Sequence, residues 1–234
     1  MAARERVSLE PAYVLHHREY RDTSRILDVF SARHGRITLF ARGARGPKSR
    51  LAPLLMPFRP LFVSWTGRGD AAQLSSAEPD GEALPLAARH IMSAFYLNEL
   101  IISLTTRHDP QPQLFDDYAR ALRRLSSETQ PEPALRVFEK RLLESIGYGL
   151  ELDVAATSHY QYRPADGLYE VREDAPDAYA GRALLALREE SLDDAQTLDV
   201  ARRLLRQALD HCLEGRELRT RNVARSMARR GLPS

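Results

Sequence analysis

The chain has 234 residues, 43% of them hydrophobic and 28% charged, which is typical of a soluble globular protein of one large or two small domains. No apolar run reaches the roughly 20 residues that a membrane-spanning helix needs, and the N-terminus lacks an apolar signal core. Cys212 is the single cysteine, which excludes a disulfide framework and a thiolate metal cluster. The sequence therefore predicts a cytoplasmic protein.

The net charge of +2 hides a strong asymmetry along the chain. Residues 1–50 contain eleven Arg or Lys and five Asp or Glu, and residues 215–234 contain six Arg and one Glu. Because the residues between them are acidic, the basic ends predict a localised surface for a polyanion.

The first eighty residues have the pattern of β-structure. Short runs rich in β-branched and aromatic residues predict five strands, at Ala12–His17, Arg25–Phe30, Arg36–Ala41, Leu61–Trp65 and Ala72–Ser76. In the third run Ile37 and Leu39 share one face, and Phe40 and Arg42 share the other. A hairpin turn is expected at Gly67–Asp70. Five short strands with a break after the third fit an OB-fold barrel, and an SH3-like barrel would have a similar pattern.

The pattern becomes helical after Glu78–Glu82, where we place the domain boundary. The predicted domains are an OB-fold over residues 1–80 and a helical domain over residues 81–234. The predicted fold class of the whole chain is therefore α+β. In the first helix Ile91, Phe95, Asn98 and Ile102 recur at helical spacing. The apolar surface is broadened by Leu97, Leu100, Ile101 and Leu104, which predicts a buried helix. Further helices are expected at 114–125, from 133 to 146, at 183–190, at 194–213 and from about 219, with an irregular, tyrosine-rich insert at about 150–181.

The segment from Phe40 to Arg50 forms a basic loop with Gly43 and Gly46, which permit close approach of the backbone to a ligand. It lacks the Gly-Lys-Ser/Thr of a P-loop. A solvated turn would also be basic, but a loop beside an aromatic strand face favours nucleic acid. The candidate DNA contacts are Arg36, Phe40, Arg42, Arg45, Lys48 and Arg50, extended by Arg18, Arg21 and Arg25.

Other clusters carry less specific signals. His16 and His17 point to opposite faces of a strand and cannot chelate one metal together. No catalytic constellation or metal-ligand spacing is found, so we expect neither catalysis nor a cofactor. On the helix from 133 to 146, Arg136, Lys140 and Arg141 could receive an acidic peptide or form a solvated face. The tail arginines could form a second DNA patch, contact a partner or be solvated: Arg219, Arg221, Arg225 and Arg229.

Blocks of residues in a specific order resemble the RecO family of bacterial recombination mediators. They lie at Ala12–His16, Asp22–Ser24, Leu27–Phe30, Gly35–Arg36, Ala41–Arg45, Pro57–Phe58, Gly67–Gly69, Ser76–Glu78, Tyr96–Leu100, Pro131–Arg136 and Gly147–Gly149. Each block is short, but together they span most of residues 12–150. Beyond residue 150 the likeness is thinner.

The resemblance implies an OB-fold followed by a helical domain, in a non-enzymatic protein that binds single- and double-stranded DNA. Such proteins anneal complementary strands, including strands covered by single-stranded-DNA-binding protein (SSB), and with RecR they help load RecA onto gapped DNA. They also bind the acidic SSB C-terminal tail through the helical domain. Of the candidate residues, Arg136 lies in a matching block, whereas Lys140 and Arg141 are inferred from helix spacing.

One departure from the family concerns zinc. Some members carry a four-cysteine site after the Gly-Tyr-Gly position, but here Leu150–His159 contains no cysteine. We therefore expect no zinc. Two other classes stay open: a hydrolase or nuclease, which would need paired carboxylates and a metal, and a generic OB-fold module that binds single strands or a protein without annealing.

Overall fold

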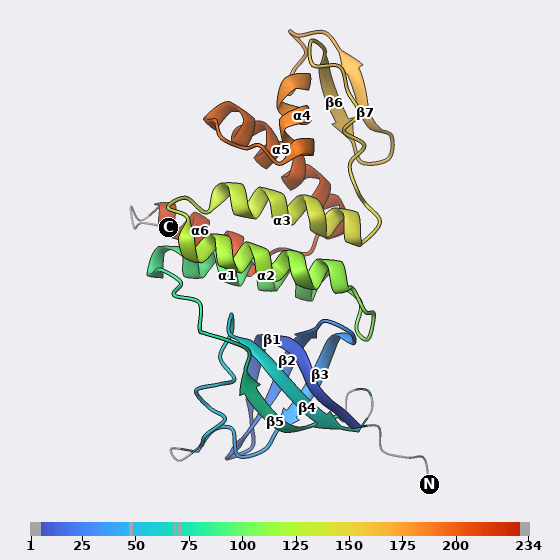
Figure 1. Ribbon diagram of the computed structural model, residues 1–234. Helices are drawn as coiled ribbons and strands as arrows, with labels where there is room; N and C mark the ends of the chain where they lie inside the picture. Colours follow the sequence, from blue (N-terminus) through green and yellow to red (C-terminus); the bar gives the residue numbers. More distant parts are fainter. Residues whose placement is uncertain (1–5, 47–48, 68, 70–71, 230–234) are drawn as a thin grey trace. The chain divides into compact units, whose positions relative to one another are not determined.

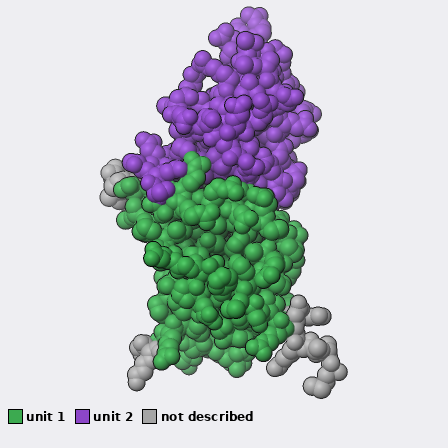
Figure 2. All heavy atoms as spheres, viewed as in Figure 1, with its two compact units in different colours: residues 1–126 green, residues 127–234 purple. Residues whose placement is uncertain are grey.

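The computed structural model describes residues 6–46, 49–67, 69 and 72–229. The chain divides into two compact units, residues 1–126 and residues 127–234 (Figure 2). The first unit contains the strand-rich region and the two helices that follow it in the chain. The division into domains at residue 80 stays a prediction.

The first unit is built on a five-stranded barrel (Figure 1). Its strands are β1 (Arg6–Tyr20), β2 (Ser24–Ser31), β3 (Gly35–Ala41), β4 (Pro60–Thr66) and β5 (Gln73–Pro79). The strand order β1-β2-β3-β5-β4 closes because β1 also pairs with β4. This is the connectivity of an OB-fold, so the predicted fold class is confirmed. The predicted turn at Gly67–Asp70 lies partly outside the described residues, which include Gly67 and Gly69.

The interior of the barrel is filled by alternate residues of the strands. Ile37, Leu39 and Ala41 point inward, as the alternation in the sequence predicts, and pack with Trp65 and Leu61. The residues between them on β3 point outward and are partly exposed. One face of β3 is thus core, and the other is available for contacts.

Strands β1 and β2 are buried on both faces along part of their length. Helices α1 (Ile91–Leu104) and α2 (Pro112–Ser127) follow a short 3-10 helix, η2 (Ala88–His90). The outward rings of Tyr13 and Phe30 pack on α2, with ring centroids 5.1 Å apart for Tyr13 and Tyr118 and 5.6 Å apart for Phe30 and Phe115. The two helices therefore cover one part of the outer barrel surface.

A buried polar bridge joins the barrel to both helices. The register between β1 and β2 shifts at Leu15, which marks a β-bulge. The Leu15 carbonyl accepts a 2.7 Å hydrogen bond from Nδ2 of Asn98, and Oδ1 of Asn98 accepts a 2.6 Å bond from the Tyr118 hydroxyl. Burial raises the pKa of Tyr118 well above its ordinary value, so this hydroxyl stays a donor.

Helix α1 is buried along most of the predicted apolar surface, and only part of that surface is exposed. Ile91 and Phe95 are each 39% exposed, whereas Leu97, Leu100 and Ile101 are fully buried. Asn98 is buried and bonds to the barrel, whereas Ile91 lies at the N-terminal end of the helix, where it is partly exposed. Phe95 instead packs edge-on against Phe58, with ring centroids 4.9 Å apart.

The second unit contains four helices and a small sheet. They are α3 (Glu132–Ser145), β6 (His159–Arg163), β7 (Gly167–Val171), β8 (Tyr179–Ala180), α4 (Gly181–Glu189), α5 (Ala195–Cys212) and α6 (Arg219–Arg229). The expectation of an irregular insert at 150–181 was wrong, since these residues contain the antiparallel sheet β7-β6-β8. Strands of five and two residues are too short to show a clear period of two.

Tyrosine side chains stabilise this sheet. The Tyr160 hydroxyl accepts a 2.9 Å hydrogen bond from the amide of Ala155, which fixes the segment that leads into β6. The guanidinium of Arg163 lies 4.5 Å from the ring centroid of Tyr169, and that of Arg203 lies 4.9 Å from that of Tyr179. Hydrogen bonds and cation–π contacts thus hold this small sheet and the segment that leads into it.

Glu10 is a fully buried carboxylate that holds the turn between β2 and β3. It accepts hydrogen bonds from the Ser31 hydroxyl at 2.8 Å and from the amide of Arg33 at 2.7 Å, and it pairs with the Arg33 guanidinium. Burial alone would raise the pKa of Glu10, but the bonds from Arg33 and Ser31 outweigh it and hold the pKa below 4.5.

We predict that Glu10→Gln lowers the free energy of unfolding by about 1–3 kcal/mol at pH 7, because an amide cannot satisfy the same donors. The depressed pKa means that the unfolded chain binds the proton more readily. The wild-type protein should therefore lose stability as the pH falls below 4.5, and the variant should lose less over that range. Urea unfolding at several pH values measures both effects, and equal pH slopes would contradict this role.

Candidate nucleic-acid interface

The kinds of side chain on the outer face of β1, β2 and β3 differ between the two ends of the strands. Residues directly opposite one another in the ladders share a face. The row under the helices joins Tyr13, Phe30 and Arg36, and a row further along joins Arg18, Ile26 and Phe40. The covered half thus carries the rings of Tyr13 and Phe30 beside Arg36, whereas the open half carries Arg18 and Phe40.

Two aromatic rings lie together on the open half. Tyr20 and Phe40 pack edge to face with ring centroids 5.5 Å apart, and Tyr20 is 37% exposed. The guanidinium of Arg21 lies 5.2 Å from the centroid of the Tyr20 ring. The sequence pattern indicates Phe40 but not Tyr20, because the predicted first strand ends at His17 and β1 continues to Tyr20.

Arg45 ties the basic loop to the turn between β1 and β2. Its amide donates a 3.1 Å hydrogen bond to the Thr23 carbonyl, and its Nη1 donates a 3.2 Å bond to the Arg21 carbonyl. Its Nη2 also pairs with Glu19 at 2.9 Å. Arg45 thus fixes the loop against the turn, and part of its charge is neutralised within the protein.

The other predicted DNA contacts differ in their surroundings. Arg18, Arg21, Arg42 and Arg50 are exposed. Gly43 has φ +65, a conformation that favours glycine and turns the loop immediately after Arg42. Arg25 is half-buried, and its Nη1 lies 3.4 Å from the Ala52 carbonyl. Lys48 lies outside the described residues.

Arg107 enters this face from the connection between α1 and α2, which no sequence signal predicted. It pairs with Asp28 at 2.9 Å and donates a hydrogen bond to the Thr38 hydroxyl. Asp28 is the carboxylate on the row that joins His16 and Thr38, so its neutralisation removes a repulsive charge from a surface for polyanions.

Arg36 has a partner within the protein. It is half-buried, and its Nη2 donates a 2.9 Å hydrogen bond to the carbonyl of Thr105, the residue that caps the C-terminus of α1. Burial and the nearby Arg107 charge lower its pKa. A Cβ at Gly35 would lie 2.0 Å from the Asp109 carbonyl oxygen. The backbone at Asp109, in the connection between α1 and α2, therefore passes very close to the start of β3. We assign Arg36 to the attachment of α1.

The three cations predicted for an acidic peptide lie on α3 among carboxylates. Arg136 is buried and pairs with Glu139 at 2.7 Å. Lys140 is also buried and pairs with Glu190 at 3.1 Å, and Arg141 pairs with the same carboxylate at 2.6 Å. Arg141 is the most accessible of the three, with 36% of its side chain exposed.

Helix α6 presents the tail arginines. Arg219, Arg225 and Arg229 are exposed, whereas Arg221 pairs with Asp210 on α5. Val223 is 44% exposed. The tail helix is therefore basic and largely solvated.

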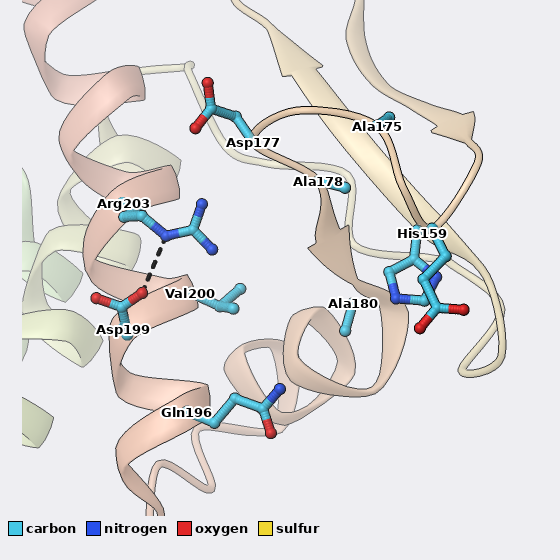
Figure 3. A pocket seen from close by; sticks show the side chains of 10 residues that line it. His159, Ala175, Asp177, Ala178, Ala180, Gln196, Asp199, Val200 and Arg203 are labelled. Atoms are coloured by element: carbon cyan, nitrogen blue, oxygen red, sulfur yellow. Dashed lines mark hydrogen bonds and ion pairs between the residues drawn. The ribbon is translucent and has the colours of Figure 1, made fainter.

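A separate hollow of about 540 Å³ lies between the small sheet and α5 (Figure 3). His159, Asp177, Asp199 and Arg203 line it, and Nε of Arg203 bonds to Asp199 at 3.0 Å. Across the part of the chain that the structure describes, no group of three or more His, Cys, Asp or Glu side chains could hold a metal ion. The absence of zinc stays a prediction.

No described helix is both long enough and apolar enough to cross a bilayer.

Comparison with known proteins identifies related chains. The family model for the N-terminal part of recombination protein O matches residues 6–80, and the model for its C-terminal part matches residues 88–222. A protein of Methylococcus capsulatus named DNA repair protein RecO is 46% identical over 229 residues, with 94% of each chain covered. A protein of the same name from Photobacterium profundum is 40% identical, with 92% of this chain and 94% of the relative covered. Another from Vibrio cholerae is 41% identical, with 93% of each chain covered.

We predict that Arg36→Ala lowers the free energy of unfolding by about 1–2 kcal/mol, since it removes a charged donor from the end of α1. Arg42→Ala, on the same strand face but exposed, should change it by less than about 0.5 kcal/mol. Urea titration of both variants measures the difference. If the two variants are equally stable, Arg36 does not hold the helix.

Proposed function

The chain belongs to the RecO family of DNA repair proteins, and from this premise we propose that it is a non-enzymatic recombination mediator that anneals complementary DNA strands. In this role it acts in the cytoplasm at the nucleoid, together with RecR and SSB, and promotes the loading of RecA onto DNA. It binds both single- and double-stranded DNA.

The observation that supports this proposal most strongly is the open half of the outer barrel face. Arg18 lies in the same row as Phe40, Arg42 follows two residues later, and Arg21 lies against the Tyr20 ring. Arg107 neutralises the carboxylate of Asp28. Cations of this kind bind phosphates of any sequence, and the affinity comes largely from the release of counterions. A surface for annealing needs this property, because it must accept two strands regardless of their bases.

A second basic surface would allow one molecule to hold two strands. The exposed arginines of α6 are suited to this role, since Arg219, Arg225 and Arg229 follow one another along a solvated helix. We propose that this helix binds phosphates of the second strand. Partial neutralisation of both strands would reduce the repulsion between them and favour pairing.

We propose that α3 receives the acidic C-terminal tail of SSB. The tail ends in an aromatic residue and a carboxylate, so it needs a cation beside an apolar surface. Lys140 and Arg141 share Glu190 as their partner, and a tail carboxylate could replace that side chain. Arg136, which is buried against Glu139, is suited to fix the helix surface beneath the tail.

We predict that Arg42→Glu weakens binding to oligothymidine and to duplex DNA alike, and slows annealing of complementary oligonucleotides with and without SSB. The slope of log affinity against log salt should fall by about 0.7 for each single-strand phosphate that the variant no longer neutralises. Fluorescence anisotropy at several salt concentrations measures this change in slope.

Arg172→Glu is the matched control, because Arg172 is 87% exposed and lies in the second unit. If Arg42→Glu behaves like this control, the barrel face does not bind the phosphates. If the wild-type protein binds DNA but does not anneal it, the chain is a generic DNA-binding module.

We predict that Glu190→Gln strengthens binding of an SSB-tail peptide roughly two- to five-fold, because it removes one of the two carboxylates, Glu190 and Glu144, that pair with Lys140 and Arg141. Arg141→Gln should weaken binding. Anisotropy of a labelled tail peptide distinguishes the two directions, and weaker binding to Glu190→Gln would place the tail elsewhere.

A further inference from the structure

We infer that Tyr20 and Phe40 together form a stacking site for an unpaired base, and that this site makes the barrel face prefer single-stranded over double-stranded DNA. The inference rests on the proposed DNA-binding function and adds a base-dependent contact to it. Tyr20, which the phosphate-binding surface does not require, is the new component.

The placement of the two rings supports a ligand rather than a core. Tyr20 is 37% exposed, and Phe40 is half-buried in a row that includes Arg18 and Gln73. The edge-to-face packing at 5.5 Å fixes one ring against the other while both keep contact with solvent. An aromatic pair of this kind on an outer strand face is suited to a flat, partly apolar partner.

The charges around the rings indicate what that partner carries. Arg21 lies against the Tyr20 ring, and Arg18 and Arg42 lie at neighbouring positions of the same sheet face. A nucleotide fits both the rings and the cations, since its base can stack on a ring while its phosphate pairs with a guanidinium. An acidic peptide would match the cations but would not need two aromatic rings.

The selectivity follows from how DNA presents its bases. In a duplex the flat faces of the bases are stacked on one another, so only edges are accessible in the grooves. In a single strand the bases can turn outward and stack on protein rings. The cations add affinity for both forms, whereas the rings add affinity only for the unpaired one.

Arg45 is the positioning residue of this site. Its bonds to the carbonyls of Thr23 and Arg21 and to Glu19 hold the turn after Tyr20 against the basic loop. Arg21 adopts φ +52, which is uncommon for a residue with a side chain, and its carbonyl is one of these acceptors. The bonds of Arg45 thus keep the turn beside the Tyr20 ring in place.

The test compares an oligothymidine with an abasic oligonucleotide of the same length, which has the same phosphates but no bases. The wild-type full-length protein should bind oligothymidine more tightly, by roughly 5- to 100-fold. Tyr20→Leu and Phe40→Leu, which keep apolar bulk but lose a ring, should reduce this ratio, while binding to the abasic strand and to duplex DNA stays unchanged. Tyr20→Phe should keep the ratio.

Tyr148→Leu is the control, because Tyr148 is also exposed, at 53%, but lies in the second unit. Circular dichroism establishes that each variant is folded, and if Tyr20→Leu unfolds, Tyr20→Phe and Phe40→Leu decide the outcome. Equal wild-type binding to both oligonucleotides, with normal salt dependence, would overturn the stacking site and leave the proposed function intact. Absence of binding to either would instead overturn the proposed function.

Discussion

The hydrogen bonds of Asn98 are the constraint on which the first unit depends. A β-bulge at Leu15 changes the pairing of β1, and Asn98 of α1 satisfies the Leu15 carbonyl while it accepts a bond from Tyr118 of α2. A buried polar group without such a partner costs about 1–3 kcal/mol. The bridge therefore fixes which part of the barrel the helices cover, and how α1 is rotated about its own axis.

This attachment divides one sheet face into two surfaces with different tasks. Under the helices Tyr13 and Phe30 pack on α2, and Arg36 bonds to the end of α1. Arg107 marks the border, since it comes from the connection between the helices and neutralises Asp28. Beyond it the same strands carry cations and aromatic rings. A short distance along a strand thus separates a structural contact from a candidate ligand contact.

Much of the fold could be predicted from the sequence, because the strands of the barrel alternate cleanly and Ile37, Leu39 and Ala41 obey that alternation. The small sheet could not, since β8 has only two residues and its tyrosine fits a loop as well. At the candidate site, the exposed position of Arg42 follows from its strand face. A local sequence pattern does not show that Arg36 and Arg45 have partners within the protein, or that Arg107 pairs with Asp28. These contacts join segments that are far apart in the sequence.

The central claim is that DNA lies on the open half of the β1–β3 face, and amide hydrogen exchange of the full chain with and without oligothymidine tests it most directly. The account predicts slower exchange in the turn between β1 and β2, around Tyr20 and Arg21, and in the loop that begins at Arg42. The amides around Tyr13 and those of β6 and β7 should exchange as before. Protection confined to residues 127–229, with none around Tyr20 or Arg42, would contradict the account.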